Sequence, residues 1–302
     1  MHSFCVQQRA DFGAAAGFGS PDVTIALTRC CEPDWLVSQA LDSLTTQEGV
    51  LAEVLLLDQT PTPALADHCA AVQQPRCDVR YQQIPKRSLS YARNRAVASA
   101  RADSILFLDA DAVASPGWAH TLHAALAGDT VGLVGARILP TWHRQPLLLA
   151  AAAVVQDQYS IFDLGSTARP FHRVVGAGFG LHRGRLGDEA RFDERLGRRP
   201  GSLLGGEESD LARRALARGL RILYEGRAVV HHQILPERIS YRWILRRMFY
   251  AGLSRALLRG APSPSRALAL TDYLALPVVL PFYGAGYLAG RMQGHGHLHQ
   301  AR

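Results

Sequence analysis

The regular alternation of short apolar runs with helical stretches, between about residues 21 and 140, constrains the fold most strongly. The apolar runs are nearly continuous, as expected of strands that are buried on both faces. Helical segments separate them, so successive strands would be parallel and joined by right-handed crossovers. The runs lie at 23–28, 53–58, 79–84, 104–109 and 131–139. The pattern predicts an α/β domain whose mostly parallel sheet carries helices on both faces.

Composition narrows the class of protein. The chain has 302 residues, of which 48% are hydrophobic and 20% charged, which is typical of a globular body. A formal charge of +7 favours an anionic partner such as a nucleotide, a phospholipid surface or a nucleic acid. Five cysteines without CxxC spacing, and a first segment without an apolar core, predict a reducing, cytoplasmic location.

The character of the chain changes after residue 235. Residues 238–259 carry six arginines and no acid among aromatic and aliphatic side chains, which predicts a basic amphipathic helix. The apolar stretch 273–289 contains two prolines and is borderline in length for a membrane span, or forms a core helix pair broken at the prolines. We therefore predict three parts: a flexible segment 1–20, a main domain 21–235 and a helical extension 236–302. The extension either packs on the domain or contacts an anionic membrane surface.

Two carboxylates end the fourth apolar run. Side chains two positions apart on an extended chain point to the same side, so Asp109 and Asp111 can face one ligand. Open α/β sheets place ligands at the carboxyl ends of their strands. Carboxylates of this kind hold Mg²⁺ or Mn²⁺ together with substrate phosphates, although acids also commonly cap strands without any such role.

Acidic and histidine clusters follow about a hundred residues later. Glu207, Glu208 and Asp210 open a helix, where acids either stabilise the helix dipole or supply a general base. His231 and His232 end a strand, where an imidazole either completes a metal site or is structural.

The order of these motifs resembles the family-two glycosyltransferases of GT-A fold. The resemblance rests on TIALTRCCEPDW, EVLLLDQT, LSYARNRAVASARADSILFLDAD, VVGAGFGLHRGRL, and GGEESDLARRALARGLRILYEGRAVVHH, and covers about residues 22–235. It implies a Rossmann-like GT-A sheet followed by a helical C-terminal extension. It also implies metal-dependent transfer of a sugar from a nucleotide-diphosphate donor to an acceptor hydroxyl, with inversion, in cell-envelope polysaccharide or glycolipid synthesis.

The resemblance assigns donor-side roles residue by residue. Asp111 matches the metal-binding end of the DxD motif, and Asp109 the position that faces the ribose or the metal. Asp58 matches an acid that contacts the nucleotide, while Arg93 and Asn94 match the ARN segment near the donor.

The remaining roles concern the metal and the acceptor. Glu208 matches the catalytic base, although the family usually has Asp there, so Asp210 stays an alternative. His232, with His231 as the other choice, matches a histidine that joins the Mn²⁺ or Mg²⁺ site. The acceptor side is expected at the four residues Gly176, Ala177, Gly178 and Glu207.

Other functions fit less well. The first strand-to-helix turn contains no glycine, which excludes the fingerprint of a dinucleotide-binding oxidoreductase. No recognised module supports nucleic-acid binding. A GT-A-like protein that binds nucleotide-sugars or partners without turnover stays an alternative. For the enzyme we predict a cytoplasmic location, peripheral at the inner face of the membrane.

Overall fold

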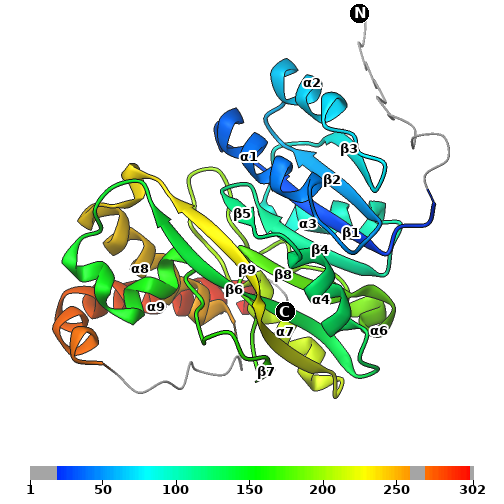
Figure 1. The fold of residues 1–302 in the computed structure, drawn as a ribbon. Helices are drawn as coiled ribbons and strands as arrows, with labels where there is room; N and C mark the ends of the chain where they lie inside the picture. Colours follow the sequence, from blue (N-terminus) through cyan, green and yellow to red (C-terminus); the bar gives the residue numbers. More distant parts are fainter. Residues whose placement is uncertain (1–18, 259–268, 300–302) are drawn as a thin grey trace, which may run out of the picture.

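The computed structural model describes residues 19–258 and 269–299, with side chains up to residue 293 in the last helix. Within this part of the chain, nine strands form one sheet in the order β3-β2-β1-β4-β8-β6-β9-β5, and β7 pairs with β9 (Figure 1). The strands are β1 (Val23–Arg29), β2 (Ala52–Asp58), β3 (Cys77–Gln83), β4 (Ser104–Asp109), β5 (Ala112–Ala114), β6 (Val131–Trp142), β7 (Arg169–Phe171), β8 (Gly178–His182) and β9 (Arg221–Ile234).

The first four strands pair in parallel, as the apolar runs predict. Side chains alternate across this half of the sheet, so Ile25 and Leu27 pack on one face and Ala26 on the other. Helices α1 (Asp34–Thr45), α2 (Pro63–Ala71) and α4 (Trp118–Leu126) bury the first face. Helices α3 (Leu89–Ser99), α6 (Arg183–Leu186) and α7 (Glu207–Ala217) bury the second. The α/β layering with helices on both faces is therefore confirmed.

The second half of the sheet is mixed. β8 runs antiparallel between β4 and β6, while β6 and β9 are parallel and β5 and β7 are antiparallel to β9. This arrangement brings the end of β9 beside β5, directly after the DxD motif. The first half of the sheet is thus entirely parallel, and the second half is mixed.

The stretch 146–155 is rich in Ala and Leu, which favour a helix, but it does not form one continuous helix. It appears as a 3₁₀ turn, η1 (Leu148–Ala151), and the short α5 (Ala153–Gln156), separated by the extended and buried Ala152. The Asp272 carboxylate accepts a hydrogen bond from Val154 N at 3.0 Å. This tertiary contact stabilises the first turn of α5 as a separate helix. Local apolar composition could not show this contact. Two further 3₁₀ turns are η2 (Asp157–Tyr159) and η3 (Gly187–Glu189).

The C-terminal extension is a helical hairpin. A 3₁₀ turn, η4 (Pro236–Arg238), leads into α8 (Tyr241–Leu257), which packs along α9 (Leu270–His299). Glycines allow this close approach, because a Cβ at Gly252 would meet the Tyr283 carbonyl oxygen at 1.9 Å. α9 continues through both prolines as one helix, so the interpretation as a helix pair broken there is wrong. Arg259, the last arginine of the basic stretch, lies outside the described residues.

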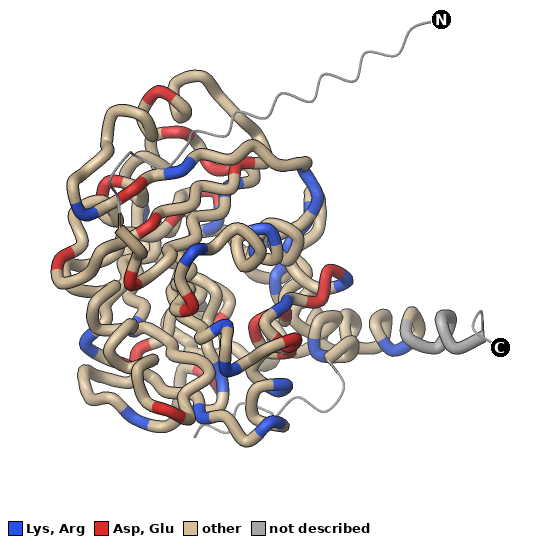
Figure 2. The backbone as a smooth tube through the Cα atoms, turned by 90° about the vertical axis from the view of Figure 1, so that its right-hand side faces the viewer, with Lys and Arg blue, Asp and Glu red and all other residues tan. Residues whose placement is uncertain are grey.

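The outward side of α9 is apolar. Leu274, Val278, Leu280 and Leu288 are between 46% and 71% exposed, although a large exposed apolar surface is unusual on a soluble monomer. Figure 2 shows α9 extending from the body of the molecule with few charged residues along it. Among the described helices, Leu270–Gln293 alone has the length and hydropathy of a membrane span, with a mean hydropathy of 1.3.

Candidate active site

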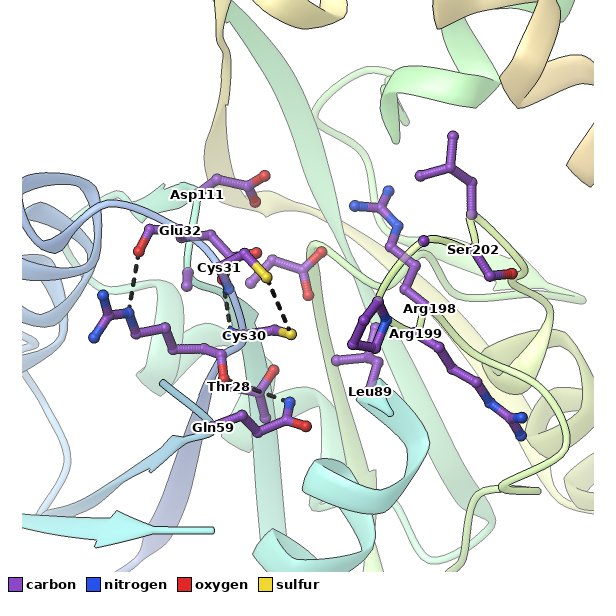
Figure 3. A pocket seen from close by; sticks show the side chains of 16 residues that line it. Thr28, Cys30, Cys31, Glu32, Gln59, Leu89, Asp111, Arg198, Arg199 and Ser202 are labelled. Carbon is purple, nitrogen blue, oxygen red and sulfur yellow. Dashed lines mark hydrogen bonds between the residues drawn. The ribbon is translucent and has the colours of Figure 1, made fainter. Parts of the chain in front are cut away.

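An open cavity of about 230 Å³ lies at the carboxyl ends of β1, β2 and β4. Cys30, Cys31 and Glu32 from the end of β1, with Asp109 and Asp111 after β4, form one wall. The loop 198–203 forms the opposite wall, and Figure 3 shows Arg198 directed toward the acidic side while Arg199 points away from it. This is the position at which open α/β sheets bind ligands. We call it the first pocket.

Asp111 meets the end of β9. His232 Nε2 lies 3.3 Å from Asp111 Oδ1, and Arg238 Nη2 lies 2.7 Å from Asp111 Oδ2. His232 Nδ1 lies 2.7 Å from the Tyr159 carbonyl oxygen, which can only accept a hydrogen bond, so this nitrogen carries a proton. Burial opposes ionisation of Asp111, but Arg238 and His232 hold the pKa of this carboxyl well below its usual range. His231, one position earlier on the strand, projects from the opposite face of the sheet.

The residues around Asp111 are compatible with a divalent metal. Among the described residues, no three His, Cys, Asp or Glu side chains are grouped so that they alone could hold an ion. Mg²⁺ and Mn²⁺ sites, however, take one or two protein ligands and complete their shell with substrate phosphates. A metal-binding histidine typically donates its second nitrogen to a carbonyl, as His232 does to Tyr159. Asp111 and His232 therefore fit such a metal when the substrate supplies the remaining oxygens.

Arg93 joins the donor-side and acceptor-side carboxylates. Its guanidinium lies 3.2 Å from Asp109 Oδ1, 3.1 Å from Glu207 Oε1 and 3.4 Å from Glu208 Oε1. It also donates a hydrogen bond to the Gly176 carbonyl at 3.1 Å. We call the four side chains Arg93, Asp109, Glu207 and Glu208 the site cluster. One arginine thus serves three carboxylates.

Apolar surroundings strengthen the interactions of the site cluster. The Arg93 guanidinium lies 5.3–6.0 Å from the ring centres of Phe107, Phe179 and Phe192, so little water reaches it. Burial opposes the charge of Arg93, but the neighbouring carboxylates raise its pKa. Burial raises the pKa of Asp109 to about 6, against the attraction of Arg93.

The two glutamates of the site cluster have different environments. Glu207 is 2% exposed, and its Oε2 has no hydrogen-bond partner within the described part of the chain. Burial and the charge of Glu208 raise the pKa of Glu207 to about 8. Glu208 keeps 17% of its side chain exposed, so it is accessible to a substrate. A Cβ at position 176 would lie 2.1 Å from Glu208 Oε1, so the glycine there leaves room for this carboxylate.

Other residues from the sequence analysis lie elsewhere. Asp210 pairs with Arg213 and Arg214 on its own helix, each at 2.8 Å. Asn94 binds the backbone of Phe192, at 2.7 and 3.0 Å, and so fastens α3 to the following loop.

Asp58 is buried at the end of β2. Its carboxylate is engaged by Arg29 at 3.2 Å, Tyr81 Oη at 2.8 Å and Thr60 N at 2.8 Å. Gln59, the next residue, lines the first pocket in its place.

Two small residues shape the backbone beside Asp109. The Ala177 carbonyl accepts a hydrogen bond from Asp109 N at 3.4 Å. A Cβ at Gly178 would lie 2.7 Å from the Val230 side chain, so this glycine permits close packing of β8. Both support the site through the backbone.

Three arginines at the site escaped the sequence analysis. Arg238 binds Asp111, Arg198 lines the first pocket opposite the carboxylates, and Arg29 holds Asp58. The only available signal for Arg238 is its position six residues after His232, in a stretch that we interpreted as a surface-binding helix. In the structure, Arg247 of the basic stretch is directed inward, onto the Leu203 carbonyl, while the exposed Arg246 donates to the Gly201 carbonyl.

Comparison with known proteins agrees with this geometry. The family model "Glycosyl transferase family 2" matches residues 34–183. A mannosyltransferase from Pyrobaculum calidifontis, solved in complex with GDP-Man and Mn²⁺, superimposes with a TM-score of 0.57 at 19% identity, over 90% of this chain and 75% of that one. This likeness shows the GT-A fold. The chain belongs to glycosyltransferase family 2.

The curated relatives are longer than this chain, which matches only part of each of them. A pre-mycofactocin glycosyltransferase of Mycobacterium tuberculosis is 26% identical over 82% of this chain and 51% of its own length. A glucosyl-dolichyl phosphate glucuronosyltransferase of Haloferax volcanii is 22% identical over 57% of this chain and 56% of its own. The chain therefore spans about half the length of the curated relatives it matches.

Proposed function

We propose that the protein is a metal-dependent, inverting glycosyltransferase that moves a sugar from a nucleotide-diphosphate donor to an acceptor hydroxyl. The observation that carries this proposal is the contact of Arg93 with both Asp109, in the first pocket, and Glu208, at the start of α7. A single guanidinium thereby fixes a donor-side and an acceptor-side carboxylate relative to each other. Such preorganisation of reacting groups is a main source of rate enhancement.

The proposed reaction is a single displacement. The acceptor oxygen bonds to the anomeric carbon as the bond from that carbon to the diphosphate oxygen breaks, and the nucleoside diphosphate leaves. The acceptor proton passes to Glu208, the exposed glutamate of the site cluster. Attack opposite the leaving group inverts the anomeric carbon. Asp210, held by two arginines on its own helix, is less suited to receive the proton.

Positive charge lies where the diphosphate would leave. Arg198 lines the first pocket, and Arg238 contacts Asp111 at its edge. Asp111 and His232 would hold Mn²⁺ or Mg²⁺, and the bound ion would neutralise charge on the leaving diphosphate. The mannosyltransferase relative, solved with GDP-Man and Mn²⁺, supports this assignment.

The next part of the proposal concerns the cellular location and the kind of product. We propose a cytoplasmic enzyme at the inner face of the membrane, acting in cell-envelope polysaccharide or glycolipid synthesis. The exposed apolar side of α9 supports membrane contact, as does the H. volcanii relative named for a dolichyl phosphate acceptor. Because Arg247 faces inward and Arg246 is bound to the Gly201 carbonyl, α8 offers fewer free arginines to a membrane than its sequence suggests.

Nucleotide release from a panel of UDP-, GDP- and dTDP-sugars with Mn²⁺ or Mg²⁺ tests the proposal. We expect metal-dependent release from one donor, lost in both Asp111→Asn and Glu208→Gln. Binding of nucleotide without any release, weakened only by Asp111→Asn, would instead support the alternative of a non-catalytic nucleotide-sugar binding protein. Absence of both binding and release would reject a donor site.

A further inference from the structure

Two adjacent cysteines follow β1 and line the first pocket. In a regular strand, neighbouring side chains point to opposite sides, but Cys30 and Cys31 lie in a bend that brings their Sγ atoms to 3.4 Å from each other. Figure 3 shows the two sulfur atoms side by side, on the side of the bend that faces the loop 198–203. The chain thus places a pair of thiols in the same wall of the pocket as Asp109 and Asp111.

Hydrogen bonds hold the bend in place. Glu32 Oε2 accepts hydrogen bonds from the amides of both cysteines, at 2.8 Å from Cys30 N and 3.0 Å from Cys31 N. The Cys30 carbonyl accepts a hydrogen bond from Thr60 Oγ1 at 2.6 Å, and the Glu32 carbonyl accepts one from Arg29 Nε at 3.0 Å. The closeness of the two thiols is therefore set by the surrounding fold.

The two thiols differ in access. Cys31 is exposed, so a reagent in solution reaches it first. Cys30 is half-buried, and burial together with its contact to Cys31 raises the pKa of Cys30 to about 12. Its thiol reacts best with a group already bound beside it, because proximity replaces an encounter in solution. Cys69 and Cys77 are buried, and burial raises the pKa of each to about 12, so both are poor targets.

A bond between adjacent cysteines would be easy to reverse. A trans peptide holds neighbouring Cα atoms about 3.8 Å apart, whereas disulfides normally join Cα atoms about 4.4–6.8 Å apart. A bond between neighbours is therefore strained, and strained disulfides are reduced readily. Closing this ring also rotates the peptide between Cys30 and Cys31, which contains the amide that donates to Glu32. Oxidation would thus disturb the wall of the first pocket.

We propose that Cys30 and Cys31 form a reversible oxidation site, at which a low-molecular-weight disulfide of the glutathione type closes the first pocket to the donor. The Cys31 sulfur bonds to one sulfur of the small disulfide, and the other half leaves as a thiol. The Cys30 sulfur then bonds to the Cys31 sulfur, and a second thiol leaves. In each step the protein thiol passes its proton to the departing sulfur, so two protein thiols are oxidised while one small disulfide is reduced. The effect on the donor rests on the proposed function, whereas the oxidation itself does not.

Mass spectrometry of the full chain after treatment with oxidised glutathione tests the site. The parent protein is a Cys5→Ser variant, because Cys5 lies outside the described residues. We expect the loss of two hydrogen atoms per chain, located by fragmentation at Cys30 and Cys31, and reversal by dithiothreitol. A parent that stays reduced, keeps one glutathione, or forms a disulfide at Cys69 or Cys77 would overturn the proposal.

Variants separate the two steps. Cys30→Ser should stop at a mixed disulfide that carries one glutathione, since the second thiol is missing. Cys31→Ser should stay reduced, because the exposed thiol is gone. Cys69→Ser is the matched control and should oxidise like the parent. Oxidation of Cys31→Ser to the same extent as Cys30→Ser would overturn the assignment of Cys31 as the thiol that reacts first.

Donor binding tests the consequence of oxidation. Calorimetry with UDP, GDP and dTDP in the presence of Mn²⁺ compares the reduced and the oxidised parent. We expect oxidation to lower the affinity for the nucleotide that binds by about 10-fold or more, and dithiothreitol to restore it. The double variant Cys30→Ser/Cys31→Ser, compared with its own untreated sample, should not respond to the oxidant. Unchanged affinity of the oxidised parent would reject the closure of the pocket.

The two measurements separate this inference from the proposed function. Nucleotide release by a protein that forms no disulfide between Cys30 and Cys31 would reject the inference and leave the proposed function intact. A disulfide between Cys30 and Cys31 in a protein that neither binds nor releases a nucleotide would reject the proposed function, and with it the closure of the pocket to a donor.

Discussion

Two clusters of buried charge lie at opposite ends of the parallel strands, and they are balanced differently. The first, which we call the support cluster, lies near the strand starts and consists of Glu53, Asp78, Arg80 and Arg101. It has two acids and two arginines, and the second Glu53 oxygen accepts a hydrogen bond from Thr24 Oγ1 at 2.7 Å. The site cluster, at the strand ends, has three acids for one arginine and leaves a buried oxygen of Glu207 unpaired.

The difference in charge balance indicates that the support cluster stabilises the fold and that the site cluster is suited to bind a substrate. A buried charge whose partners are all supplied by the protein offers nothing to a substrate, while removing one partner leaves an uncompensated charge and is strongly destabilising. A cluster short of positive charge favours a partner that supplies it, such as an incoming proton or a metal-bound substrate, and tends to have perturbed pKa values. Changes in the support cluster should therefore alter stability alone, whereas changes in the site cluster should separate stability from activity.

The largest effect is expected from Glu208→Gln. Loss of a general base lowers a transfer rate by about 10²–10⁴-fold. Stability should not fall, since the change removes one of three acids that compete for Arg93. Steady-state nucleotide release and thermal unfolding measure the two properties. Asp210→Asn is the matched control, with an activity loss below about 10-fold; a larger loss there than in Glu208→Gln would transfer the role of base to Asp210.

Arg93→Met should produce the largest loss of stability. It leaves three carboxylates without their common partner, and breaking a buried ion pair in this way costs about 3–5 kcal/mol. Urea unfolding measures the loss. In the support cluster, Arg80→Met should cost about 1 kcal/mol or less, because Arg80 is 32% exposed and Arg101 still binds Glu53. Similar losses in the two variants would show that the clusters do not differ.

Thr24→Val tests the support cluster by removing the hydroxyl that binds Glu53. Thr24 Oγ1 donates to Glu53 and accepts from Ala102 N at 3.1 Å, so valine leaves a buried amide unpaired. We expect a loss of about 1–3 kcal/mol in urea unfolding. Nucleotide release per folded molecule should be unchanged. A fall in release greater than about three-fold would contradict a purely structural role, since 0.65 kcal/mol or more would then act at the site.

The sequence predicts the first half of the fold better than the second, for a physical reason. Apolar runs and helix periodicity are local properties, and they indicate β1 to β4 with nearly correct bounds. The second half depends on contacts between distant segments. The Arg93–Glu207 pair, for example, joins residues 114 positions apart.

The same limit applies to the site residues. Adjacent histidines look equivalent in the sequence, and only the register of β9, which is shifted by an irregularity beside Ala136, directs His232 and not His231 toward Asp111. The motifs point to Asp109, Asp111 and Glu208 because the proposed reaction needs a carboxylate at each of these positions. The sequence does not identify Arg238 as a site residue, because an arginine in a basic segment has many possible roles.

The smallest expected effect is a change in pH dependence for Glu207→Gln. Burial, with the charge of Glu208, raises the pKa of Glu207 from 4.5 to about 8, so its neutral form is favoured in the folded state. The stability that this preference provides is complete below about pH 4.5 and is lost as pH rises through about 8. Glutamine resembles the neutral acid and does not titrate. The melting temperature of Glu207→Gln relative to the wild type should therefore rise between pH 5 and pH 9.

Glu225→Gln is the control for this measurement, because its environment is the opposite. Glu225 is buried too, but Arg227 binds both of its oxygens at 2.9 and 3.0 Å and holds its pKa below the usual range. Its stabilising effect is present above the unfolded-state pKa and is lost only as pH falls, so Glu225→Gln should be destabilised by the same amount at pH 7 and pH 9. A parallel pH dependence in the two variants would mean that Arg93 neutralises Glu207 as fully as Arg227 neutralises Glu225, and the description of the site cluster as short of positive charge would fail.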